Sequence, residues 1–149
     1  MTLDNAYTIA GNGLDVQAER IKIHADNIAN AGTPNYVRKV PILSESTTTS
    51  FQDVISSMRN GNMLKGGISE TLGGVEMSGV MEDPTPGKKI YQPGNPEADK
   101  DGYVTYSNVD ILSDMADATA TARLYEANLA VLKVVGSMEN QALNIGKSS

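Results

Sequence analysis

Apolar side chains recur every three to four residues at both ends of this chain, and that spacing predicts a long helix at each terminus. All six prolines lie between Pro34 and Pro96, so neither terminal stretch contains a helix breaker. The pattern predicts an α+β fold, in which the N- and C-terminal helices pack as a coiled-coil-like hairpin beside a β-rich, loop-rich middle segment. We divide the chain accordingly into residues 1–33, 34–106 and 107–149.

The first helix is expected to run from about Asp4 to Ala31, because Gly32 can adopt the left-handed conformation that ends a helix and Pro34 cannot continue one. Its packing stripe has a seven-residue spacing and consists of Tyr7, Leu14, Ile21 and Ile28, with Leu3 and Ala10 between them. Gln17 and His24 occupy the next interleaved positions, where apolar residues are expected. The stripe should therefore weaken there.

The middle segment loses the helical period and predicts short strands, turns and loops. The expected elements are, in order, a strand over Tyr36–Leu43 broken at Pro41, an exposed loop over Ser44–Ser50, a short helix over Phe51–Met58, a hairpin over Gly67–Met81 interrupted at Gly73-Gly74, and a second hairpin in which Lys89–Tyr91 and Tyr103–Tyr106 bracket the loop Gln92–Gly102. This segment supplies the β part of the predicted fold.

The last helix is expected to run to about Ile145, with Gly146 just beyond its end. Ser107-x-x-Asp110 before an apolar run resembles a capping box, and Asp110 and Asp114 are favourably placed for the helix dipole. Three seven-residue series follow: Met115, Ala122 and Leu129; Ala118, Tyr125 and Leu132; and, toward the end, Leu124, Val131, Met138 and Ile145. Such drift is expected of a long helix that contacts more than one neighbour.

The length of the last helix indicates a partner. A helix of roughly 38 residues is about 57 Å long, whereas a compact domain of this chain's size is about 38 Å across. Its far end must therefore contact something outside the domain or fray. Because the first helix has few large apolar side chains, we expect it to be loosely ordered in an isolated monomer and ordered in an assembly.

The composition excludes several classes of function but does not identify one. The net charge of −6 and the absence of a basic run argue against nucleic-acid binding. The chain has no Cys, so disulfides, thiolate metal sites and thiol chemistry are excluded. The first residues lack the basic and apolar regions of a Sec signal peptide, and no stretch approaches the roughly 18 apolar residues of a membrane span.

No catalytic, cofactor or metal site emerges from the residue pattern. His24 is the only histidine, and spacing identifies no nucleophile or metal for it, so we expect a structural place on the helix seam. Glu97-x-Asp99-x-Asp101-Gly102 imitates the start of a calcium loop, but Asn108 stands where the bidentate Glu is required. A solvated hairpin tip is the favoured interpretation. The paired glycines lack the order of a phosphate-binding loop.

The residues Ala25–Tyr36, with Asn35 near their end, carry a family resemblance. They are similar to the motif ANNIANANTPGY that closes the N-terminal helix in axial proteins of the bacterial flagellum, with Asn35 in place of the usual Gly. The resemblance implies that Asn27, Asn30 and Pro34 set the turn out of the helix.

Two further segments resemble the proximal rod proteins within that family. The first is Tyr91-x-Pro93-Gly94-Asn95-Pro96 with the following Ala98-Asp99, Gly102-Tyr103-Val104 and Asn108-Val109-Asp110, where Ser107 stands in place of an expected Pro. The second is Ala122-Arg123-x-Tyr125-Glu126-Ala127-Asn128 in the last helix. The stretch from about Ser44 to Val80 matches no family motif.

The resemblance implies a structural role. Such proteins polymerise with copies of themselves and other rod proteins into a tube crossing the periplasm, and they arrive unfolded through the flagellar type III export channel without a cleaved signal. The membrane-embedded ring and the export apparatus are further partners of this kind of protein. The helices would form the inner wall, and the middle segment would lie outside.

For subunit packing, the residues predicted are Leu14, Ile21, Ile28, Leu124, Tyr125, Leu129, Leu132 and Met138. Tyr125 and Asn128 are open to two interpretations, plain packing or fixing the register between subunits. Two alternatives remain for the whole chain: a helical binding module that docks a partner helix or an export chaperone, and, within the family, a different rod protein. An enzyme is the weakest option.

Overall fold

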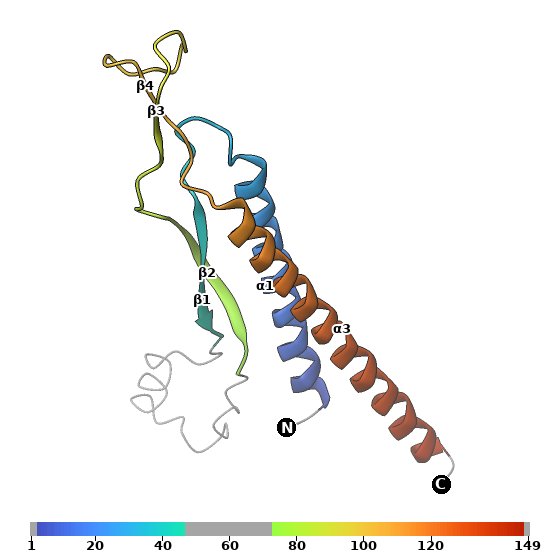
Figure 1. Cartoon of the computed structure of the whole chain (residues 1–149). Helices are drawn as coiled ribbons and strands as arrows, with labels where there is room; N and C mark the ends of the chain where they lie inside the picture. The colour runs from blue at the N-terminus through green and yellow to red at the C-terminus, as the bar shows by residue number, and fades with distance from the viewer. Residues whose placement is uncertain (1–2, 47–72, 148–149) are drawn as a thin grey trace, which may run out of the picture.

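The computed structural model describes residues 3–46 and 73–147, and its fold is α+β, as predicted (Figure 1). The chain begins with one long helix, α1 (Leu3–Ala29), and ends with another, α3 (Ile111–Lys147), and the four short strands lie between them in sequence. The strands are β1 (Lys39–Glu45), β2 (Val75–Glu82), β3 (Lys89–Tyr91) and β4 (Tyr103–Thr105). The short helix expected over Phe51–Met58 lies outside the described residues.

The helices pack along each other and run antiparallel, so the start of α1 lies near the end of α3 (Figure 1). An ideal Cβ on Gly13 would lie 2.7 Å from Asn128 Nδ2, and one on Gly136 would lie 2.7 Å from the Tyr7 hydroxyl. The two glycines therefore mark points of close approach between the helices. At about 1.5 Å per residue, the 37 residues of α3 outreach the 27 residues of α1.

The part of the predicted α1 stripe that is most buried differs from the expected one. Gln17 and His24, expected to weaken the stripe, are buried, whereas Tyr7 is exposed and Leu14, Ile21 and Ile28 are only half-buried. We call the polar residues that face each other between the helices the polar seam: Gln17, His24 and Asn27 on α1, with Asp114, Thr121 and Asn128 on α3. The helical period was predicted correctly, and the buried residues include the interleaved positions Ala10, Gln17 and His24 of the predicted stripe, whereas its large apolar residues are less buried.

Both helix ends differ in detail from expectation. Gly32 is not left-handed. Instead, the Asn30 side chain donates to the Asp26 carbonyl at 2.8 Å, and Asn35 takes the left-handed conformation at φ 59°. Gly146 lies within α3 and does not terminate it.

The start of α3 is capped by Asp110, not by Ser107. The Asp110 carboxylate accepts the backbone N–H groups of Leu112 and Ser113 at 3.0 and 3.3 Å. Ser107 instead accepts the N–H of Val109 at 3.2 Å, in a turn before the helix.

The strands form two separate antiparallel pairs, β1 with β2 and β3 with β4. The break expected at Pro41 does not occur, because Pro41 lies within β1 and pairs with Val80. Ser44 and Glu45, which were expected in a loop, also belong to β1. The described part of the expected Gly67–Met81 hairpin also differs, because Val75 and Met77 lie in β2 and pair with β1. The β3–β4 hairpin is confirmed.

The apolar core of the described residues is small. Its buried members are Ala10, Val16, Ile23, Val104 and Val135. Val16 and Ile23 are seven residues apart on α1 and face β2, which contacts α1 directly. The β1–β2 pair thus lies along one side of α1 and α3 along another, while the β3–β4 hairpin extends past the helix ends (Figure 1).

Candidate functional site

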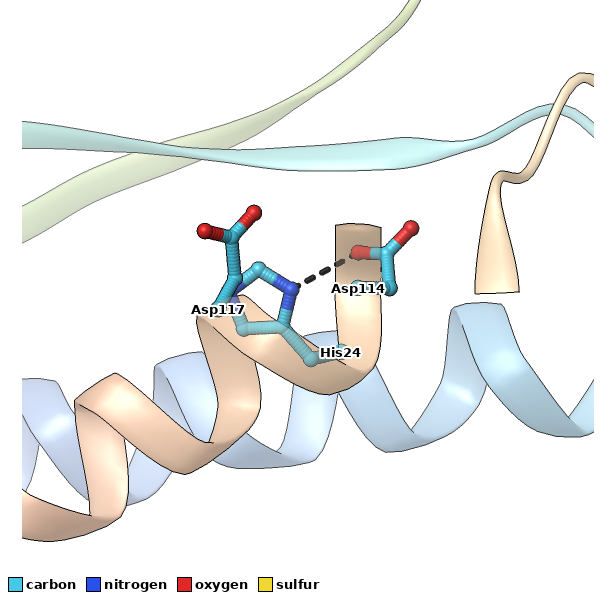
Figure 2. Close-up of side chains that lie close together, drawn as sticks. All are labelled: His24, Asp114 and Asp117. Carbon is cyan, nitrogen blue, oxygen red and sulfur yellow. Dashed lines mark hydrogen bonds and ion pairs between the residues drawn. The ribbon is translucent and has the colours of Figure 1, made fainter. Parts of the chain in front are cut away.

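Asp114 is the centre of a buried polar cluster that joins α1, β1 and α3. It lies in the first turn of α3 and has no exposed surface. Its Oδ1 is hydrogen-bonded to His24 Nδ1 at 2.8 Å (Figure 2). Arg38, just before β1, donates from Nε to Oδ2 at 2.9 Å and from Nη2 to Oδ1 at 3.2 Å. Asn27 Nδ2 lies 3.3 Å from Oδ1. We call these four residues the Asp114 cluster.

The cluster stabilises the charged form of the carboxyl group. Burial of Asp114 raises its pKa and is the largest single influence, but hydrogen bonds from Arg38, His24 and Asn27 together bring the pKa below the ordinary value of 3.8. The hydrogen bond to Asp114 is also the main cause of a raised pKa of Arg38. An ionised Asp114–Arg38 pair therefore connects the start of α3 to β1.

Asn27 connects the end of α1 to the first residue of β1. Its Oδ1 accepts the Lys39 N–H at 2.9 Å and its Nδ2 donates to the Lys39 carbonyl at 2.8 Å. The Tyr36 hydroxyl donates to the same Oδ1 at 3.1 Å. The side chain thus pairs with the backbone of β1 as a neighbouring strand would.

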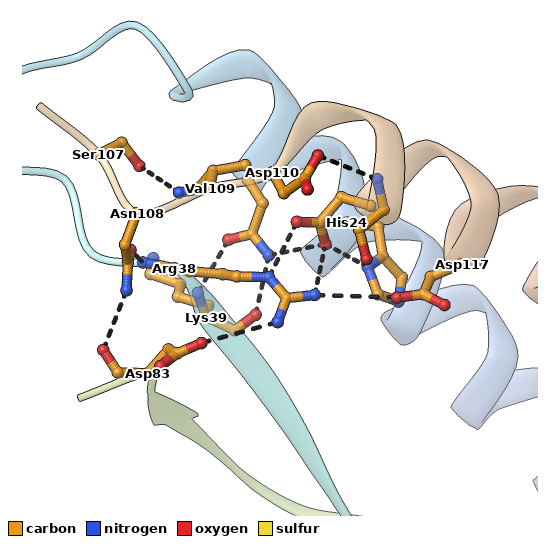
Figure 3. A network of polar contacts seen from close by, with 12 residues as sticks. His24, Arg38, Lys39, Asp83, Ser107, Asn108, Val109, Asp110 and Asp117 are labelled. Carbon is orange, nitrogen blue, oxygen red and sulfur yellow. Dashed lines mark hydrogen bonds and ion pairs between the residues drawn. The ribbon is translucent and has the colours of Figure 1, made fainter. Parts of the chain in front are cut away.

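Arg38 and Asn108 extend the network to the segment before α3 (Figure 3). The Asn108 Oδ1 accepts the Arg38 N–H at 2.7 Å, and its Nδ2 donates to the carbonyls of Asp83 and Thr85 at 3.2 and 2.8 Å. The Arg38 guanidinium also lies 3.8 Å from carboxylate oxygens of Asp83 and Asp117. Three chain segments distant in sequence are thereby held together.

His24, Asp114 and Asp117 are close enough to be considered as metal ligands, since their ligand atoms lie within 4.8 Å of one another (Figure 2). The Arg38 guanidinium, however, already contacts both carboxylates and supplies the positive charge at this point. This arrangement is that of a structural ion-pair network. The structural place expected for His24 is the one observed.

Sequence reasoning did not identify Arg38, Asn108 or Asp114 as members of a site. The signal for Asp114 was present, because the series Ala118, Tyr125 and Leu132 continues backward by four residues to position 114. That series faces α1, and an aspartate on a helix-facing stripe requires a partner.

The family-motif loop forms the tip of the β3–β4 hairpin. Tyr91 is exposed and packs edge-on against Tyr103, with ring centroids 5.2 Å apart. Asn95 closes the turn by accepting the Glu97 N–H at 3.0 Å, and the Asp99 carboxylate accepts the N–H of Tyr103 at 2.9 Å. Pro93, Gly94 and Pro96 complete this tip, and Pro93 lies against Gly102, which is left-handed at φ 82°.

The other notable surface is the outer face of α3, which carries large exposed apolar side chains. Leu124, Val131 and Met138 follow one another at seven-residue spacing, and Val134 and Ile145 lie in the same heptad pattern. Each of the five is about half exposed or more, from 47% at Val131 to 70% at Ile145. We call them the apolar ridge. Ala120 precedes Leu124 in the same pattern, and Ala127 is a small residue between Leu124 and Val131.

Of the eight residues predicted for subunit packing, Leu124 and Met138 belong to the apolar ridge. Leu129 is exposed on another part of α3, while Tyr125 and Leu132 are half-buried on the side toward α1. Leu14, Ile21 and Ile28 are half-buried on α1. Their role between subunits stays a prediction, as does the role of Asn27, Asn30 and Pro34 in setting the turn out of the first helix. In the described part of the chain, no helix is long and apolar enough to cross a membrane.

In the comparison with known proteins, both terminal parts of the chain match families of flagellar rod proteins. Residues 8–36 match the family model described as flagella basal body rod protein, and residues 100–145 match that described as flagellar basal body rod FlgEFG protein C-terminal. The chain is 33% identical over 147 residues to the flagellar basal-body rod protein FlgC of Salmonella typhimurium, and 33% identical over 147 residues to that of Escherichia coli O157:H7. It is 32% identical over 149 residues to FlgC of Buchnera aphidicola from Acyrthosiphon pisum. Each match covers 99% of this chain and 100% of the relative.

Proposed function

This chain belongs to the FlgC family of flagellar basal-body rod proteins, and we propose that its two terminal helices are what build it into the rod. As a member of that family it is a structural subunit of the flagellar basal body. The competing class, a helical module that docks one partner, is not favoured by this membership.

The observation that carries the proposal is the distribution of side chains around α3. A surface helix of a soluble protein usually buries its apolar residues and exposes its polar ones. Here Asp114 and Thr121 have no exposed surface, whereas the apolar ridge is uncovered. Burying a large aliphatic side chain contributes about 1.5–3 kcal/mol, so a helix from a neighbouring subunit would be stabilised strongly on this face.

We infer that the helices line the inner wall of the rod and that the β segments lie outside them. In support, α1 and α3 run side by side, and the β1–β2 pair lies against α1 away from the ridge-bearing helix (Figure 1). The partners are other rod proteins and further copies of this chain, and the membrane-embedded ring and export apparatus are contacted during assembly. The location proposed for this chain is the periplasmic part of the basal body.

The route to that location is export through the flagellar type III system, unfolded and without a cleaved signal peptide. The small core supports this part of the proposal. The described residues bury five apolar side chains, none larger than Ile23, so the free energy of unfolding to be overcome before threading is modest. No catalytic reaction is assigned, because the Asp114 cluster uses its polar groups to join three chain segments.

The test places a charge on the apolar ridge in cells that depend on this chain for motility. Met138→Asp should abolish swimming and the recovery of the chain in purified basal bodies, because a carboxylate in an apolar helix contact must be desolvated. Ser137→Asp is the matched control. It adds the same charge one residue away, on the exposed flank of the ridge, and should leave assembly largely intact.

Both variants must be produced and exported at the level of the unmodified chain. Assembly of Met138→Asp into normal rods would show that the apolar ridge is not an assembly surface and would refute the proposal.

A further inference from the structure

We propose that the apolar ridge of one copy of this chain inserts into a groove between α1 and β2 of the next copy. The inference rests on the proposed function and adds to it the two surfaces that meet. It also predicts that the contact is head-to-tail, with a different surface contributed by each copy.

The groove has a volume of about 420 Å³ and an apolar floor and wall. Ile23 of α1 is buried at its base, and Met77, Val80 and Met81 of β2 line its side. Val80 and Met81 remain nearly half exposed, although β2 is paired with β1 along its length. We call this the α1/β2 groove. Aliphatic side chains of another element are what such a lining would accommodate.

The apolar ridge has the shape that fits a groove. Ala127 lies between Leu124 and Val131 in its heptad pattern, so these two large side chains project as separated knobs. It lies about 100° around α3 from the face that contacts α1, because the two heptad series are offset by one residue. Packing against α1 therefore leaves the ridge uncovered.

Ridge and groove lie on different parts of the molecule. Among the described residues, α3 makes its inter-element contacts with α1, and the groove is formed by α1 and β2. A contact between two different surfaces of identical chains repeats from copy to copy, and it generates an open helical array when its rotation does not close into a ring. Ridge-to-ridge pairing would instead close at a dimer and stop growth. A rod requires the open form.

Charge at the margins agrees with this pairing. The rim of the groove carries three carboxylates and two ammonium groups: Glu19, Asp26 and Glu82, with Lys22 and Lys39. Arg123 is exposed on the flank of the ridge, and no ion pair of Arg123 occurs within residues 3–46 and 73–147. Its guanidinium would face the more acidic rim and help select the groove over the ridge.

The chain has no Cys, so introduced cysteines give an unambiguous test. We would make Met81→Cys in the groove and Val131→Cys on the ridge, and produce both variants together in motile cells. A short thiol-specific bismaleimide is then applied to basal bodies. Each single variant must support swimming, which shows that its rods are assembled.

The expected result is a covalent product of twice the chain mass only when both variants are present. The double variant Met81→Cys/Val131→Cys should give a ladder of higher products, because each copy offers both surfaces. Leu112→Cys with Val131→Cys is the control pair, since both side chains are exposed on α3 and neither lies in the groove. It should give no mixed product.

Three outcomes would overturn the inference: swimming cells without the mixed product, dimers from Val131→Cys alone, or an adduct with a different protein. None of these affects the proposed rod function, which is judged separately by Met138→Asp.

Discussion

The carboxylate of Asp114 is buried, and the hydrogen bonds around it compensate for the loss of its contact with water. Arg38 approaches the carboxylate from just before β1, and His24 and Asn27 approach it from α1. Removal of the charge would therefore leave the Arg38 guanidinium without its main partner. Breaking a buried pair from one side usually costs more than the pair contributes. The cluster is therefore a sensitive point for stability.

Replacement of Asp114 by Asn should lower the free energy of unfolding by about 3 kcal/mol at neutral pH. The folded-state pKa of Asp114 lies below 3.8, so its contribution is fully present above that value and is lost as the pH falls through the lower folded pKa. The difference between the unmodified chain and Asp114→Asn should therefore shrink below about pH 4. Urea unfolding measured from about pH 7 to about pH 2 checks both points.

Asp117→Asn is the control for this series, because Asp117 is half exposed and 3.8 Å from Arg38. It should change the free energy of unfolding by less than about 1 kcal/mol. A deficit of Asp114→Asn that stayed constant down to the lowest pH would contradict the ionised state assigned to the carboxyl group.

Asn35 illustrates a local backbone requirement. Its φ of 59° lies in the left-handed region, where Asn is tolerated and β-branched residues are not, and its N–H donates to the Thr105 carbonyl at 2.9 Å. Asn35→Val should cost about 1–2 kcal/mol, whereas Asn35→Gly should be neutral or slightly stabilising. Thermal unfolding of the two variants distinguishes them. Equal losses in both would show that the Asn side chain, and not the backbone, matters.

At the scale of elements, sequence periodicity predicted where the helices lie but not which residues of the α1 stripe are most deeply buried. The period selects the large apolar residues, such as Leu14 and Ile21, and assumes that the chain itself covers them. In this chain α3 covers Gln17 and His24 instead. Which face is buried depends on the partners present, and a single sequence does not specify them.

The middle of the chain shows a second limit. The strand was expected to be broken at Pro41. However, β1 pairs with β2 on one edge only, and an edge strand can accommodate a Pro, which lacks an N–H. The β3–β4 hairpin was predictable because β-favouring residues on both sides flank a loop rich in Pro, Gly and Asn. The Asp114 cluster was not predictable, because its other three members lie 76 to 90 residues from Asp114 in the sequence.

Gly13 gives a testable consequence of close helix packing. A Cβ there would lie 2.7 Å from Asn128 Nδ2, so Gly13→Ala must displace the Asn128 side chain and should gain little of the roughly 1 kcal/mol that Ala adds to a helix. In an Asn128→Ala background the same substitution should gain that amount in full. A double-mutant cycle by urea unfolding measures the coupling, and strict additivity would exclude the contact.

At the scale of the whole molecule, the two ends of the helix pair have different support. The Asp114 cluster fixes the end of α1 to α3 and β1, whereas the opposite end has Gly11, Gly13 and the exposed Tyr7. Beyond the start of α1, the last residues of α3 have exposed side chains, including Ile145. Stability should therefore decrease along the pair, away from the cluster.

This gradient predicts the pattern of amide hydrogen exchange in the full chain as a monomer. Amides of α1 near His24 and Asn27 should exchange slowly, because they open only with the cluster. Amides of residues 4–13 and 140–147 should exchange at least about tenfold faster, and this difference should disappear in assembled rods, where neighbours cover the apolar ridge. Mass spectrometry of exchanged monomers and purified basal bodies provides the comparison. Uniformly slow exchange along both helices of the monomer would mean that the chain stabilises its own ends, and the uncovered face of α3 would no longer require a neighbour.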